Sequence, residues 1–185
     1  RFDVGALAIT TDDKPSAGAL STTFSALRVR RNILRRSSIG MMTTGRWPAS
    51  AGSGENASAG VDANLQFFEN VETNVYWART SSPGRHGADA SYRGRFDYGG
   101  DRYGFEFDRL VVESNFNPEV GFVRRTDFAL SKVAARFSPR LRQGRLVRRL
   151  SWDGELEYIQ DAAGQTLEDR TFSGHFQTEF NSSDR

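Results

Sequence analysis

Apolar and polar side chains alternate along most of this chain with a period of two residues. The alternation is clearest between Asn56 and Phe68, where the odd positions are apolar and the even positions are small or polar. Because successive side chains of a β-strand point to opposite faces of a sheet, this pattern predicts a strand with one apolar face. Three more segments repeat it clearly, at residues 90–98, 150–158 and 172–180.

Weaker copies of the pattern bring the prediction to about ten strands. The apolar parity changes around Asp108, from Phe105 and Phe107 to Leu110 and Val112, which indicates a β-bulge or an exit from the buried zone. No phase can be assigned to residues 72–80. The weaker segments lie at residues 2–10, 21–31, 36–45, 72–80, 103–113 and 127–137.

The predicted connections are generally long and short in turn. Most odd-numbered connections are longer and contain proline, whereas an even-numbered one such as Gly99-Gly100-Asp101 is a tight turn in which glycine supplies positive φ. Strands of about 9–11 residues with short turns at one end and long loops at the other are typical of transmembrane β-barrels. The expected fold is therefore all-β, an antiparallel up-and-down transmembrane barrel of about ten strands. Residues 1–185 would form a single barrel domain or a fragment of a larger barrel.

The alternation does not by itself decide which face of the sheet meets water. A soluble barrel around an apolar ligand would turn the row of Phe172, Phe176 and Phe180 inward, and a membrane barrel would turn it toward lipid. Consecutive same-face charges on the opposite face favour a polar lumen and thus the membrane barrel. Aromatic residues near strand ends are typical of interfacial girdles, and the candidates are Trp47, Trp77, Tyr98, Tyr103 and Tyr158.

The polar face supplies the candidate lumen-lining residues. Arginines on one group of strands and acidic residues on another would set a field across the lumen and bias which solutes pass. The candidates are Arg28, Arg30, Asp62, Asn64, Gln66, Arg93, Arg95, Asp97, Asp153, Glu155, Glu157, His175, Gln177 and Glu179.

Composition narrows the classes of protein that remain. No run of the 185 residues approaches the ~18 consecutive apolar residues of a transmembrane helix, and 12% aromatic residues argue against disorder. A net charge of +2 gives little support for a nucleic-acid partner, so none is expected. The absence of cysteine excludes disulfides and thiolate metal sites. Because the chain begins at Arg1 without Met or an apolar leader, we expect it to be part of a longer protein.

Four strings of the sequence are specific enough to compare: NFNPEVGFVRR at residues 115–125, YRGRFDYGGDRY at 92–103, FSALRVRR at 24–31 and ILRRSSIG at 33–40. They resemble a family of bacterial outer-membrane proteins of unknown function, and NFNPEVGFVRR is the most specific of the four. In that family a carbohydrate-binding module, similar to family nine of such modules, precedes a C-terminal β-barrel.

The resemblance implies a porin-like barrel segment in a Gram-negative outer membrane, in contact with its lipid. A saccharide ligand and a missing N-terminal carbohydrate-binding module are also implied. The chain departs from the usual pattern because it ends at residues 181–185 without a terminal aromatic residue. That departure implies that further barrel strands followed in the parent protein.

A long connection carries the motif that the resemblance makes most specific. The loop could fold into the lumen as a plug, or it could be a turn that sets the strand register. Its residues are Asn115, Phe116, Asn117, Pro118, Glu119, Val120, Gly121 and Phe122.

Candidate chemistry is sparse. Acidic residues 153, 155 and 157, with Glu179 nearby, could imitate the carboxylate pair of a glycoside hydrolase, but a lumen row has the same pattern. His175 lacks a convergent nucleophile, and the only other histidine, His86, lies in a distant loop. We therefore expect no catalytic, cofactor or metal site. The predicted function is a passive channel or a membrane anchor linked to saccharide binding or uptake. The alternatives are a soluble barrel that binds a glycan or apolar ligand, and the barrel part of a surface hydrolase.

Overall fold

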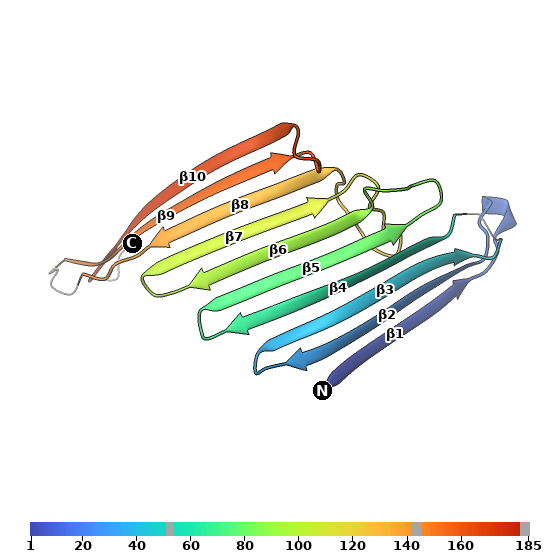
Figure 1. The fold of residues 1–185 in the computed structure, drawn as a ribbon, viewed down its shortest axis with the longest axis horizontal. Coiled ribbons are helices and arrows are strands. Elements are labelled where there is room, and N and C mark those ends of the chain that lie inside the picture. Colours follow the sequence, from blue (N-terminus) through green and yellow to red (C-terminus); the bar gives the residue numbers. More distant parts are fainter. Residues whose placement is uncertain (51–53, 142–145, 182–185) are drawn as a thin grey trace.

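Ten antiparallel strands form one continuous sheet in which each strand pairs with its neighbours in sequence (Figure 1). The computed structural model describes residues 1–50, 54–141 and 146–181. A single 3₁₀ turn, Pro15–Ala17, follows the first strand. The strands are β1 (Phe2–Thr11), β2 (Thr22–Ile33), β3 (Ser37–Pro48), β4 (Asn56–Phe67), β5 (Val71–Ser81), β6 (Ala90–Gly99), β7 (Tyr103–Val112), β8 (Phe128–Phe137), β9 (Val147–Gln160) and β10 (Leu167–Phe180).

The strand prediction is confirmed, and its main error concerns β7. This strand pairs with both neighbours without a register shift, so of the two explanations offered for the parity change near Asp108, the bulge is wrong. The apolar parity changes because Leu110 and Val112 lie on the charged side, near the base of the β7–β8 loop. At this place Val112, the last residue of β7, and Phe116 of the loop are both buried. The irregularities lie instead near the two ends of β10.

The register separates the sheet into two chemically different faces. One row runs through Val4, Val29, Met41, Val61 and Trp77 on strands β1 to β5, and the same side of β6–β10 is rich in aromatic residues. We call this side the apolar face and the opposite side the charged face. Most of the apolar face is open, since the sheet has a single layer.

The segment that could not be phased, β5, follows the same rule. Val75 and Trp77 lie on the apolar face, where Arg79 extends beyond the apolar residues. Tyr76 and Ala78 lie on the charged face and mask the alternation. The sequence pattern failed here because three exceptions, at Tyr76, Ala78 and Arg79, break the alternation in the second half of the strand.

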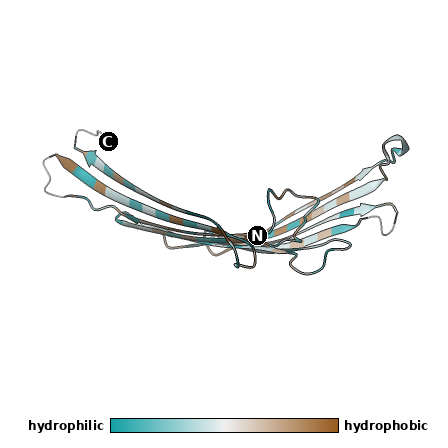
Figure 2. Ribbon diagram, turned by 90° about the horizontal axis from the view of Figure 1, so that it is seen from above, coloured by the Kyte–Doolittle hydropathy of each residue, from teal (hydrophilic) through white to brown (hydrophobic). Residues whose placement is uncertain are grey.

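The apolar face is turned toward the reader in Figure 1. The Asn32 N–H donates to the carbonyl of Arg1 at 3.3 Å, so the peptide groups of odd β1 residues point toward β2 and those of Val4 point away. For an L-residue on a strand that runs upward, peptide groups that point right place the side chain toward the viewer. Seen from above, the two lateral ends of the sheet curve away from this side, so its middle lies nearest to the viewer of Figure 1 (Figure 2). The apolar face is therefore convex and the charged face is concave.

The apolar residues form a band that crosses the strands obliquely. The first polar residue below the band is Arg31 on β2 and Thr178 on β10. When the register is followed across the sheet, Arg31 is level with Arg170 of β10, so the border drops by eight residues over eight strands. The border thus drops by one residue, about 3.3 Å, for each strand spacing of about 4.8 Å. The strands are therefore tilted by about 35° from the normal to the band. Strands of transmembrane barrels tilt by about 35–45°.

A row of neighbouring aromatic rings marks the lower border of this band on β7–β10, with the first two of the following pairs stacked and the third tilted. Ring centroids lie 5.3 Å apart for Tyr103 and Phe137, 5.8 Å for Phe137 and Trp152, and 5.3 Å for Trp152 and Phe176. Of the aromatic residues expected near strand ends, Tyr98 and Tyr103 do lie at this border, Trp47 lies at the opposite end of β3 and Tyr158 near the upper border. The placement of Trp77 near a strand end is wrong, because it lies within β5.

The sheet is open. In the part of the chain that the structure describes, β1 pairs only with β2 and β10 only with β9, so the expected barrel closure is not seen. None of the helical segments among these residues is long and apolar enough to cross a membrane.

Candidate functional site

All fourteen residues predicted to line a lumen lie on the charged, concave face. The register places Arg28, Asp62, Arg93, Glu155 and His175 there, and their predicted companions occupy the same parity on the same strands. The alternation therefore assigned the side of the sheet correctly. What it could not give is which charges meet.

The longest reach on this face joins Arg28 of β2 to Asp62 of β4, across the intervening strand β3. The guanidinium donates to both carboxylate oxygens, at 2.5 and 2.8 Å. The strand between them carries Gly40, where an added Cβ would lie 2.6 Å from Nη2 of Arg28. A larger residue at position 40 would displace the arginine, so this ion pair depends on a glycine of the strand that separates its two partners.

Shorter pairs join neighbouring strands diagonally. Arg93 donates to the carboxylate of Asp108 at 2.8 and 2.5 Å, and Nε of Arg95 lies 3.3 Å from Glu106. Lys132 lies 2.8 Å from Glu155. Charges expected to stand as separate positive and negative rows are thus neutralised locally, and the field across the concave side is weaker and more finely divided than we expected.

Three partners in these pairs were missed by sequence reasoning. Glu106, Asp108 and Lys132 all have the parity of the charged face, but β7 and β8 were among the weakly patterned strands. The signal that could have found them was available in the register. If Arg93 and Arg95 line a face, the facing residues of the next hairpin strand are the first candidates for their counterions.

Other candidates are not brought into a reactive arrangement. Glu155 is held by Lys132, Glu179 lies 3.5 Å from Nη1 of Arg148, and Asp153 accepts a hydrogen bond from the Ser151 hydroxyl at 2.9 Å. No group of three or more metal-ligating side chains is found within residues 1–50, 54–141 and 146–181. A cavity of about 260 Å³ lies near the short-turn end of this face, lined by Arg136, Arg149, Ser151, Asp153, Gln177 and Glu179.

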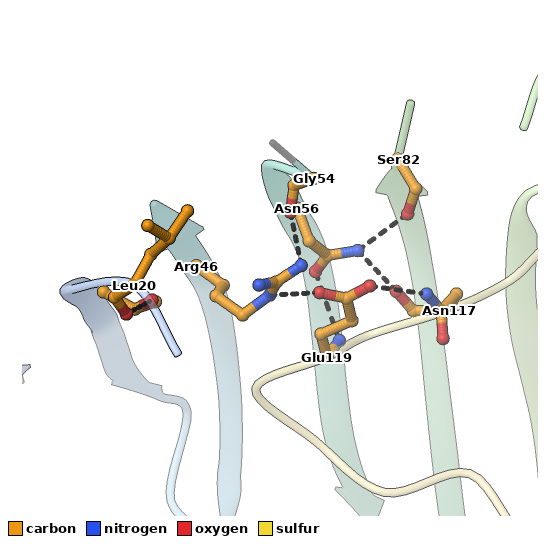
Figure 3. A network of polar contacts seen from close by, with 8 residues as sticks. Leu20, Arg46, Gly54, Asn56, Ser82, Asn117 and Glu119 are labelled. Carbon is orange, nitrogen blue, oxygen red and sulfur yellow. Dashed lines mark hydrogen bonds and ion pairs between the residues drawn. The ribbon is translucent and has the colours of Figure 1, made fainter. Parts of the chain in front are cut away.

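The loop between β7 and β8 folds back over the charged face and reaches strands β3 to β5 (Figure 3). Its Asn117 N–H donates to the Thr80 hydroxyl at 3.0 Å, and its Glu119 carboxylate forms an ion pair with Arg46. Arg46 also donates to the carbonyl of Gly54. Of the two roles predicted for this loop, these contacts agree with the folded-in one.

Asn56 is the centre of this attachment, and every polar atom of its side chain is used. Its amide donates to the Ser82 hydroxyl at 2.8 Å and to the Asn117 carbonyl at 2.7 Å, while its carbonyl accepts from the Glu119 N–H at 3.1 Å. The residue is 1% exposed. We call the contacts of Asn117 and Glu119 with Arg46, Asn56 and Thr80 the loop tether.

The motif residues around the tether divide into anchored and free ones. Asn115 donates from its backbone to Ala88 at 2.8 Å and from its side chain to Gly87 at 2.9 Å, and Phe116 is buried. The Gly121 N–H donates to the Pro118 carbonyl at 3.0 Å and closes a turn. Phe122 is 84% exposed, so the second half of the motif projects from the sheet.

A further ion pair supports the loop between β5 and β6. Arg79 donates to both carboxylate oxygens of Asp89, at 2.7 and 3.1 Å, and these hydrogen bonds hold the pKa of Asp89 below its usual value. The Asp89 carbonyl also accepts from the Thr80 N–H at 3.0 Å. Since Thr80 takes part in the loop tether, the two long loops are connected through one residue.

Comparisons with known proteins found no matching family model, no matching curated protein and no matching solved structure. A functional proposal for this chain therefore depends on the geometry of its sheet.

Replacing Asn56 by Ala should release the β7–β8 loop. The change removes three hydrogen bonds and leaves the Glu119 N–H without its partner, at a cost of about 1–3 kcal/mol to the folded loop. We expect faster limited proteolysis between residues 113 and 127. Asn64→Ala on the same strand is the matched control and should leave the cleavage rate unchanged. Equal protection in Asn56→Ala would show that the tether does not hold the loop.

Acid should loosen the β5–β6 loop. Because the pKa of Asp89 is lower in the folded protein than in the unfolded chain, where it is about 4, its ion pair stabilises the fold above that unfolded value. This stabilisation is lost as the pH falls through the folded pKa. Amide hydrogen exchange of residues 82–89 should then accelerate at low pH, after correction for intrinsic rates. In Asp89→Asn this acid-dependent step should vanish; its persistence would assign the step to another group.

Proposed function

We propose that this chain is a wall segment of a bacterial outer-membrane β-barrel, with its convex apolar face against lipid and its concave charged face along a polar path. In this role it acts as a passive channel wall or a membrane anchor. The resemblance to outer-membrane proteins of unknown function agrees with this role.

The oblique apolar band is the observation that carries the proposal. Apolar side chains such as Val4, Val61 and Phe172 are 67%, 55% and 77% exposed on a sheet that has no second layer. Water would make such a face strongly unfavourable, at roughly 25 cal/mol for each Å² of apolar surface. The strands are tilted by about 35° from the normal to the band, which is what a barrel needs if the band is to lie parallel to a bilayer.

The curvature favours this arrangement over a soluble ligand-binding barrel. A barrel that encloses an apolar ligand has its apolar side chains on the concave side. In this sheet the concave side carries the ion pairs of Arg28, Arg93, Arg95 and Lys132. A polar, solvated interior is therefore the better fit.

The lengths of the connections support one orientation. Transmembrane barrels have short turns on the periplasmic side and longer loops on the extracellular side. The turns that follow β2, β4 and β6 span residues 34–36, 68–70 and 100–102, whereas the loop that follows β7 spans residues 113–127. The loop tether would then narrow the polar path from the cell-surface side.

A saccharide is the solute or ligand class that we propose for this path. The proposal rests on the resemblance to proteins with an attached carbohydrate-binding module. The charged face also offers many neutral hydrogen-bonding groups, among them Asn64, Gln66, Tyr76 and Gln177. Paired charges and amides suit sugar hydroxyls better than they suit a small ion of one sign.

Refolding the chain into detergent micelles and then into phosphatidylcholine bilayers tests the proposal. We expect insertion, measured by flotation with vesicles, and ion conductance in planar bilayers if a closed path forms. Insertion without conductance would assign the anchoring role. A monodisperse chain that stays soluble without detergent and does not float with vesicles would contradict the proposal.

Arginine scanning by depth tests the band itself. Val61→Arg, near the middle of the band, should lower the free energy of unfolding in vesicles by about 2–4 kcal/mol, as measured by urea titration. Phe176→Arg, in the lower aromatic row, should cost only about 0–1 kcal/mol. Asn64→Arg, on the charged face of the same strand as Val61, serves as the control and should change little. Equal costs at positions 61 and 64 would mean that the apolar face does not contact lipid.

A further inference from the structure

Among the residues of the apolar face that the strand register pairs, the charged ones are all arginines: Arg31, Arg79, Arg109 and Arg170. The charged face differs sharply, since its paired strand residues include many carboxylates: Asp3, Asp62, Glu72, Asp97, Glu106, Asp108, Asp153, Glu155, Glu157, Asp169 and Glu179. Glu168 of β10 stands at an irregularity of the register and pairs with Arg125. A surface whose paired strand residues carry guanidinium groups and no carboxylates is complementary to an anionic partner.

Two of these arginines stand in one row across four adjacent strands. The register pairs Arg109 with Ser131, Ser131 with Tyr158 and Tyr158 with Arg170. We call these four residues the donor row, because each carries a hydrogen-bond donor. The next row below them consists of Phe107, Val133, Leu156 and Phe172. Above the donor row on the same face, Val111 and Ala129 are buried. The donor row thus lies at the upper border of the exposed part of the apolar band, on the long-loop side.

The guanidinium groups of this row lack carboxylate partners in the described part of the chain. Arg109 donates to the Ser131 hydroxyl, and the guanidinium of Arg170 makes no hydrogen bond or ion pair there. Both nearby acids are engaged elsewhere: Glu168 pairs with Arg125, and Asp169 accepts from a backbone N–H and from Thr171. By contrast, Arg79 on the same face is neutralised by Asp89.

A guanidinium at the edge of an apolar band needs an anion, since the adjacent medium solvates charge poorly. Phosphate is the anion whose oxygens match the planar fork of arginine. Arg109 and Arg170 are three strand spacings apart, about 14 Å along the sheet. Two guanidinium groups so placed, with two hydroxyls between them, suit a lipid headgroup that carries phosphates at both ends of a disaccharide.

We infer that the donor row binds the phosphorylated glycolipid of the outer leaflet, with its phosphates on Arg109 and Arg170 and its acyl chains on the apolar row below. The inference rests on the proposed function, because it requires that the long loops face the cell surface and the apolar face contact lipid. It goes further by naming the lipid class and the residues that select it.

Binding of lipid A to the full chain in neutral detergent micelles tests the inference. Native mass spectrometry should show a complex whose dissociation constant rises about tenfold or more in the double variant Arg109→Gln/Arg170→Gln, as expected for the loss of charge-assisted hydrogen bonds. Arg31→Gln is the matched control, since it removes an arginine from the same face at the opposite border, and its dissociation constant should match that of the parent. Arg109→Lys/Arg170→Lys should retain part of the affinity.

Two lipid controls separate the sources of the signal. Dephosphorylated lipid A should bind at least tenfold more weakly, and inorganic phosphate at equal concentration should not compete. Unchanged binding in the Gln double variant, equal loss in Arg31→Gln, or full competition by inorganic phosphate would each overturn the inference. Flotation of the Gln double variant with phosphatidylcholine vesicles is scored separately. If the variant inserts normally but lipid A binding is unaffected, the lipid site is wrong while the membrane role stands.

Discussion

A single-layer sheet has no partner for its second face, and this constraint governs the molecule. Its backbone hydrogen bonds are made between strands, but its side chains have no opposing layer to pack against. Among the residues that the structure describes, the few buried apolar ones, Val111, Val112, Phe116 and Ala129, gather near the base of one loop. Folding of such a chain in isolation would recover little hydrophobic free energy. Lipid on one side and polar contacts on the other must supply what a second layer supplies in a globular protein.

The two faces answer this constraint by different means. On the convex side, rows of apolar and aromatic residues meet the surrounding medium, and the charges among the paired strand residues stand at the borders. On the concave side, charged residues form ion pairs with one another, such as Arg28 with Asp62 and Lys132 with Glu155. Half-exposed pairs of this kind contribute modestly to stability. Their main effect is to present a polar surface without a large excess of either sign.

The strands and their faces were predictable because period-two alternation is a local property of the chain. The position of Asp62 or Glu155 on a face follows from parity alone. Ion pairs were less accessible, since Asp108 and Lys132 lie on strands where Leu110, Val112 and other apolar residues interrupt the charged face. The loop tether could not be predicted at all. Asn56 and Thr80 read as ordinary strand residues, and their partners lie 61 and 37 positions away in sequence. Closure was not accessible for a different reason, because alternation carries no information about how many strands complete a circle.

The tether also bears on the order in which the sheet can assemble. Arg46 and Glu119 are 73 positions apart, with four strands between them, so bringing them together early would require closing a long loop at a substantial entropic cost. Once β4 to β7 have formed in register, the same contact closes over a preformed surface. A shift of one residue between β4 and β5 would turn Asn56 or Thr80 to the wrong side. The tether therefore acts as a test of register, one that only a correctly paired set of strands can pass.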